Sequence, residues 1–172
     1  WFRNVLEDAR TKGYKVLVSH HAPAEFDAID CPFTIQDFNN NGTRSKATDD
    51  ELAEVQTFID NGGTFVAWLT GHLHQDVIGT CKGYVNGVIK DYPNQLQIAI
   101  DTSRIPRNVN GSSVYQGGNY KIADTKSNYC LDVVAVTEKT ITIQRVGTEY
   151  DKIGRKIESF VYNFTNHEII HK

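Results

Sequence analysis

The first half of the chain alternates between two patterns of apolar residues. In residues 1–13 the apolar residues recur at helical spacing and a glycine follows them. Residues 14–19 instead form a short apolar run that is typical of a strand. Residues 22–47 show no period, which predicts an irregular connection. Helical spacing resumes behind a capping box at Thr48-Asp49-Asp50-Glu51 and stops at Gly62-Gly63, before a second apolar run over residues 64–70. This order predicts a β-α-β crossover with two parallel strands. The helical residues expected to be buried are Trp1, Phe2, Val5, Leu6, Ala9, Leu52, Val55, Phe58 and Ile59.

The second half of the chain favours strands over helices. Residues 95–100 alternate like a half-buried strand, and residues 103–119 are rich in Asn, Gly, Ser and Arg, which is typical of a loop. Residues 131–136 and 140–146 read as a hairpin across a three-residue turn, and residues 158–163 as a last strand. We therefore expect one α/β domain over residues 1–172. Its mixed sheet begins with the parallel β-α-β unit and ends with antiparallel strands, and about two helices cover one face.

Four of the six histidines directly follow the two apolar runs of the first half. His20-His21-Ala22-Pro23 comes after one run, and Gly71-His72-Leu73-His74 comes after the other. A single histidine beside a strand is usually structural. Two such strand ends in one small domain are better explained by a ligand site, because the carboxyl ends of parallel strands meet at one edge of an open sheet. Neutral imidazoles suit zinc, iron, nickel or manganese, so the pattern predicts a metal site.

These two motifs resemble the last two signatures of the calcineurin-like metallophosphoesterases, a strand followed by His and Pro and then Gly-His-x-His after a strand. The hairpin over residues 131–146 is similar to the closing strand pair of many members. The resemblance implies a four-layer α/β/β/α sandwich, of which this chain would supply about half, and two divalent metal ions that activate water for the hydrolysis of phosphate esters. By resemblance, His20 and His72 would ligate one ion and His74 the other. His21 competes with His20 for its role, because the His-Ala-Pro spacing favours it, and Asp76 would lie near the site and orient a ligand.

The family's N-terminal signatures are missing. Asp-x-His, Gly-Asp-x-x-Asp and Gly-Asn-His-Glu/Asp do not precede His20, and Asn166-His167-Glu168 lies at the wrong end of the chain to replace the third. The chain is therefore expected to be the C-terminal portion of an enzyme and to be inactive by itself. It would either need the missing N-terminal half or self-associate through an uncovered apolar sheet face.

Two other functions fit the same histidines. The chain could be a non-catalytic metal-binding or interaction module, or a mononuclear zinc hydrolase in which three histidines leave a fourth position for water. Weaker candidates for contact with a substrate lie in the predicted loops. They are Asp27, Asp30, Asp37, Arg104, Arg107 and Tyr115.

Composition narrows the partners. The net charge is −3 without a basic stripe, so nucleic acid is not indicated, and no run approaches the roughly 18 apolar residues of a membrane span. Cys31, Cys81 and Cys130 are odd in number and far apart, which indicates no disulfide framework and favours a reducing compartment such as the cytoplasm.

Overall fold

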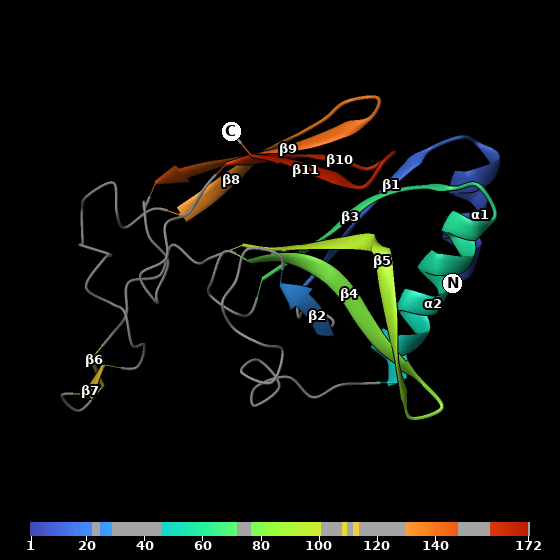
Figure 1. Cartoon of the computed structure of the whole chain (residues 1–172), viewed down its shortest axis with the longest axis horizontal. Coiled ribbons are helices and arrows are strands. Elements are labelled where there is room, and N and C mark those ends of the chain that lie inside the picture. Colours follow the sequence, from blue (N-terminus) through green and yellow to red (C-terminus); the bar gives the residue numbers. More distant parts are fainter. Residues whose placement is uncertain are drawn as a thin grey trace. The chain divides into compact units, whose positions relative to one another are not determined.

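The computed structural model describes residues 1–21, 25–28, 46–71, 77–100, 108–109, 112–113, 130–147 and 159–171. They belong to two compact units (Figure 1). Unit 1 contains, in chain order, α1 (Phe2–Thr11), β1 (Lys15–His20), β2 (Glu25–Ala28), α2 (Lys46–Asp60), β3 (Thr64–Thr70), β4 (Val77–Val85) and β5 (Val88–Ala99). Unit 2 contains β6 (Asn108–Val109), β7 (Ser112–Ser113), β8 (Cys130–Val136), β9 (Thr140–Gly147), β10 (Phe160–Asn163) and β11 (Glu168–His171). The expected single domain over residues 1–172 stays a prediction.

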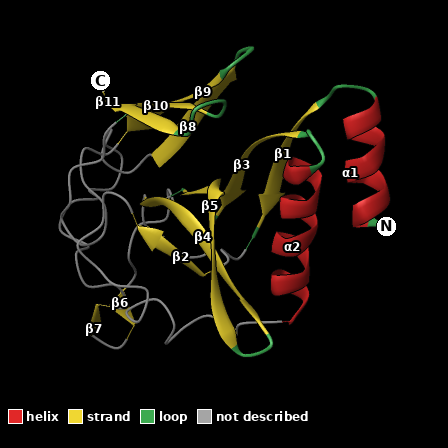
Figure 2. Ribbon diagram, turned by 45° about the vertical axis from the view of Figure 1, so that its right-hand side comes forward, coloured by secondary structure: helices red, strands yellow, loops and turns green. Residues whose placement is uncertain are grey.

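Unit 1 is a five-stranded mixed sheet with two helices on one face. The strand order is β1-β3-β5-β4-β2, in which the β1–β3 and β3–β5 pairs are parallel and the β5–β4 and β4–β2 pairs antiparallel. Figure 2 shows α1 and α2 on the same side of the sheet, where their buried side chains form one cluster with residues of β3, β4 and β5. The predicted mixed α/β class and parallel β-α-β start are therefore confirmed.

Helix α1 buries a narrower face than expected. Leu6 and Ala9 are buried and Phe2 is half-buried against the cluster, but Trp1 is 92% and Val5 46% exposed, so the prediction that they are buried is wrong. A helix turns about 100° per residue, which carries Trp1 and Val5 to the side of the stripe formed by the other three. The helix ends before Gly13, whose φ of +68° suits glycine.

Helix α2 begins at Lys46, two residues before the predicted N-cap. Thr48 therefore lies inside the first turn and is not the N-cap, so the capping-box prediction is wrong. Within the first turn, an Asp49 carboxylate oxygen accepts a hydrogen bond from the Tyr84 backbone N–H at 2.9 Å, which ties α2 to β4. The predicted stop is confirmed, since α2 ends at Asp60 and is followed by Gly62, whose φ is +86°.

Three strands of the two larger sheets were not predicted. β4 forms a hairpin with β5 through Asn86-Gly87, where φ values of +53° and +82° indicate a type I′ turn. β2 lies within residues 22–47, which were predicted to be irregular, and it pairs with β4. The third, β11, pairs with β10.

Unit 2 is built on a four-stranded antiparallel sheet of order β11-β10-β9-β8, which confirms the predicted antiparallel C-terminal strands and the hairpin between residues 131 and 146. Its two faces differ. One buries Ile141, Ile143, Phe160 and Tyr162, and the other exposes Leu131, Val133, Val146 and Ile170 to between 43% and 54%. In unit 1, by contrast, Val66, Leu96 and Ile98 are buried although they lie outside the helix-covered cluster. An exposed apolar sheet face therefore exists in the described chain, on unit 2.

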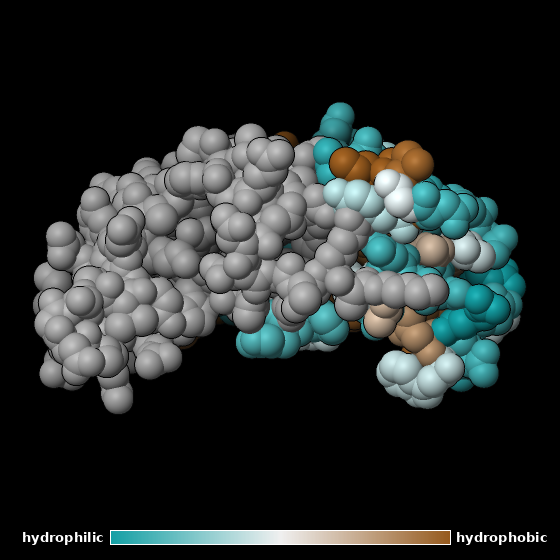
Figure 3. Space-filling model, turned by 90° about the horizontal axis from the view of Figure 1, so that it is seen from below, coloured by the Kyte–Doolittle hydropathy of each residue, from teal (hydrophilic) through white to brown (hydrophobic). Residues whose placement is uncertain are grey.

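One view of the surface is mostly hydrophilic where the described residues are visible. On the face shown in Figure 3, apolar atoms form small patches among polar ones. Neither described helix has the length and apolar character needed to cross a membrane.

Candidate metal centre

The ends of neighbouring strands are level at one edge of the unit 1 sheet. His20 at the end of β1 pairs with Thr70 at the end of β3, and Thr70 pairs with Ala99 at the end of β5. Ala99 also pairs with Val77, the first residue of β4. Three parallel carboxyl ends and one amino end therefore form a row across four adjacent strands, the position at which open α/β sheets bind ligands.

One backbone hydrogen bond joins the residues that follow β1 and β3. The backbone N–H of Gly71 donates a hydrogen bond to the carbonyl oxygen of His21 at 3.0 Å. Gly71, the first residue of the second histidine motif, is thus bonded to His21 of the first.

His20 and His21 are both exposed. Side chains alternate along a strand, and Val16 and Val18 pack toward the helices, so His20 at the end of β1 belongs to the helix-covered side. His21 follows the strand in a bend, outside this alternation. The choice of His20 over His21 as a ligand stays a prediction.

His72, His74 and Asp76 lie outside the described residues. The described residues on either side of this segment are Gly71, which follows β3, and Val77, the first residue of β4. No group of three or more His, Cys, Asp or Glu side chains occurs among the described residues, a search that leaves out His72 and His74.

Sequence reasoning did not consider Asp101, a carboxylate that follows β5 closely in the sequence. Asp101 follows Ile100, which is the residue after Ala99 at the end of β5, and it too lies just outside the described residues. The rule that identified the histidines, a polar residue directly after an apolar strand, would have found it. A carboxylate would add the anionic oxygen donor that the three histidines lack.

The weaker candidates are not brought to this row by the described residues. Asp27 lies in β2, the strand at the opposite edge of the sheet from β1, where it pairs with Thr80. The other five lie outside the described residues. They are Asp30, Asp37, Arg104, Arg107 and Tyr115.

A buried polar network links the strands β3 and β5 to helix α2. The indole Nε1–H of Trp68 donates to the Gln95 side-chain oxygen at 3.1 Å, and the Gln95 amide donates to the Leu52 carbonyl at 2.8 Å. Gln95 is fully buried, so these bonds connect β3, β5 and α2 where water is absent. Near the row itself, the Thr70 hydroxyl donates to the carbonyl of Ile98 at 3.5 Å.

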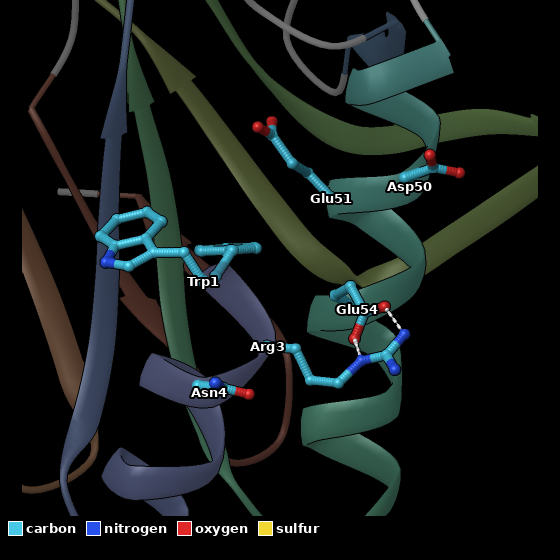
Figure 4. Close-up of a pocket in the computed structure, with 7 residues that line it drawn as sticks. Trp1, Arg3, Asn4, Asp50, Glu51 and Glu54 are labelled. Atoms are coloured by element: carbon cyan, nitrogen blue, oxygen red, sulfur yellow. Dashed lines mark hydrogen bonds and ion pairs between the residues drawn. The ribbon is translucent and has the colours of Figure 1, made fainter.

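A hollow of about 400 Å³ lies between α1 and α2 (Figure 4). Its charged lining consists of Asp50, Glu51 and Glu54 from α2 and Arg3 from α1, and the Arg3 guanidinium is bound by both oxygens of Glu54. Carboxylates outnumber the single engaged cation, which would repel a phosphate ester. The row of strand ends is therefore the better candidate site.

The His167 ring is engaged elsewhere. Its Nδ1 lies 2.8 Å from the Tyr162 hydroxyl in the turn between β10 and β11, and burial lowers the pKa of the imidazole. The neighbouring Asn166 amide donates to the Glu168 carboxylate at 2.7 Å. In this turn His167 has a φ of +59° and a local partner, which fits a structural role for Asn166-His167-Glu168.

Comparison of the sequence with models of known protein families and with curated proteins gives no match.

Proposed function

We propose that this chain contributes His20, His72 and His74 to a two-metal centre that hydrolyses phosphate esters, as the C-terminal portion of a calcineurin-like metallophosphoesterase. The observation that supports it is the level pairing of His20 with Thr70, extended by the hydrogen bond from Gly71 to His21. This register starts both histidine motifs at the same place on the sheet edge, as a shared metal site requires.

The donor chemistry of this edge fits divalent ions. His20 is exposed on a strand end held by a parallel ladder, which limits the movement of its backbone. Imidazole is neutral when it binds a metal and leaves the ion's positive charge available to a phosphate. When bound, two ions would lower the pKa of a bridging water and offset charge on the phosphoryl oxygens.

The three histidines are an incomplete set for two ions, because no carboxylate bridges them. The missing donors would come from an N-terminal half, and Asp101 is the candidate within this chain. We therefore expect the 172-residue chain to bind metal weakly and to hydrolyse p-nitrophenyl phosphate negligibly.

The first test is metal binding. Calorimetric titration with Mn²⁺ or Zn²⁺ should give a weak signal that is lost when His20, His72 and His74 are all replaced by alanine. His167→Ala is the matched control, because it removes one histidine from the β10–β11 turn and should leave binding unchanged. Single His20→Ala and His21→Ala variants decide which neighbour is the ligand. Equal binding by the triple variant and the original chain would refute the proposal.

The second test is activity, which separates the proposal from its alternatives. Joining the chain to its flanking sequence should restore turnover if that sequence carries Asp-x-His and Gly-Asn-His motifs, and His72→Ala should abolish it. Robust turnover by the 172-residue chain alone would instead favour the mononuclear three-histidine zinc hydrolase. Metal binding without turnover, even with the flanking sequence, would favour a non-catalytic module.

A further inference from the structure

One flank of unit 1 combines an open strand edge with exposed apolar side chains. β1 is at the end of the strand order among the described residues, and Leu17 in its centre is 39% exposed. On its outer side, no described strand pairs with β1. Open edges of this kind are ready to pair with another strand.

Helix α1 adds a second apolar strip beside that edge. Arg3 reaches α2 through Glu54, and a step of about 100° per residue puts Val5 on the opposite side of the helix. Trp1 is the N-cap of α1; it is exposed and also lines the edge of the hollow between α1 and α2. Figure 4 shows the indole of Trp1 on the side of α1 away from α2. Since α2 packs on β3, β4 and β5 of the sheet, the side of α1 away from it faces the β1 edge.

The strip on α1 also carries one acidic and one basic residue, which can face groups of a second copy without bringing like charges together. Asp8 and Lys12 continue the spacing of Trp1 and Val5 along the helix and form an ion pair at 2.7 Å. In an antiparallel pair of α1 helices related by a two-fold axis, Trp1 at one end would face Lys12 of the second copy, and Val5 would face its Asp8. An aromatic ring and a cation attract each other, and no like charges are brought together.

We propose that a second copy of this chain docks on this flank, through antiparallel pairing of the two β1 strands and side-by-side contact of the two α1 helices. The inference goes beyond the proposed function and does not depend on it. Residues that face each other across an antiparallel pair lie on the same face of the sheet. The register that keeps apolar residues together centres on Leu17, which faces Leu17 of the second copy, while Val16 faces Val18. The single charge, Lys15, then faces Ser19, and His20 faces Tyr14, which is 60% exposed. The second copy would thus place a phenol ring beside the histidine edge.

Sedimentation velocity of the 172-residue chain tests this without metal or substrate, so its result is independent of the proposed function. We expect a concentration-dependent monomer–dimer equilibrium. Leu17→Lys and Leu17→Glu should each raise the dimer dissociation constant about 100-fold, because like charges would meet on the axis. Val85→Lys is the matched control, since Val85 is a similarly exposed aliphatic residue on the β4–β5 hairpin, and it should leave the equilibrium unchanged.

Mixing the two Leu17 variants is the decisive measurement. The ammonium group of the Leu17→Lys chain would meet the carboxylate of the Leu17→Glu chain only in the register given above, so the mixture should form dimers although each variant alone does not. A chain that stays monomeric at all concentrations would overturn the proposal, and so would failure of the mixture to dimerise. Dissociation by Val133→Lys with no effect of Leu17→Lys would place the interface on the exposed sheet face of unit 2 instead.

Discussion

Replacement of Gln95 by leucine tests how much the buried amide network contributes to the free energy of unfolding. Gln95 is fully buried, and its side chain accepts from Trp68 and donates to the carbonyl of Leu52. Leucine has a similar size but no polar atoms, so the indole N–H of Trp68 would be left buried without a partner. An orphaned buried donor costs about 1–3 kcal/mol, and we expect Gln95→Leu to lower the free energy of unfolding by about 2–3 kcal/mol.

The double variant isolates the hydrogen bond from other effects. Trp68→Phe removes the donor itself, so Gln95→Leu should cost about 1–2 kcal/mol less in that background than in the original chain. Urea unfolding followed by far-ultraviolet circular dichroism measures all four proteins. Gln56→Ala is the control, because its contact with Gln95 is long, at 3.5 Å, and its loss should change stability by less than about 0.5 kcal/mol. Additive costs in the double variant would refute this account of the network.

Further predictions concern Asp132, Cys81 and Gly63. Asp132 and Arg145 form a buried ion pair in unit 2, and Asp132→Leu should cost about 3–5 kcal/mol in urea unfolding, whereas replacing both residues with leucine should be close to neutral. Burial raises the pKa of Asp132 despite the neighbouring guanidinium, so its contribution to stability is full below the unfolded-state pKa and is lost as pH rises through the folded-state pKa. Asp132→Asn should remove that loss from the pH dependence of the midpoint, and an unchanged profile would contradict it. Burial also raises the pKa of the Cys81 thiol, so a chain whose other two cysteines are serine should not react with a disulfide reagent at mildly alkaline pH until urea unfolds it. Gly63→Ala should lower the melting temperature, because its Cβ would overlap the Phe58 ring, and an unchanged melting curve would mean that the ring moves aside.

The parts of the fold that could be predicted are those with strong local patterns. Helical periodicity with a glycine stop located both helices, and two apolar runs located β1 and β3. The missed strand β4 had a signal, since Asn86-Gly87 is a strong hairpin turn. The short strands β2 and β11 had none, because four residues carry little pattern and their pairing partners are set by tertiary structure. The start of α2 at Lys46 differed from its cap signal at Thr48, as helix ends are less sharply encoded than helix interiors.

At the candidate site, too, the local features could be predicted from the sequence and the tertiary ones could not. The sequence located both histidine motifs at strand ends, and the parallel connection predicted that the ends share an edge. It could not predict that His20 and Thr70 are level, because register depends on packing along the whole strand pair, including the irregularity between Val16 and Leu17. Asp101 was within reach of the same rule but was not identified.

The parallel pairing of β1 with β3 also has a consequence for the order in which unit 1 folds. Val85 and Val88 meet across a two-residue turn, so the β4–β5 hairpin needs little loop closure. Lys15 pairs with Thr64, which is 49 residues further along the chain. The entropy lost on closing that loop opposes the contact until α2 is formed between the two strands. The row of strand ends would then be assembled late, after the hairpin and the helices. A folding intermediate of unit 1 would hold a formed hairpin but no aligned histidine edge, and metal added during refolding would act on the last step rather than the first.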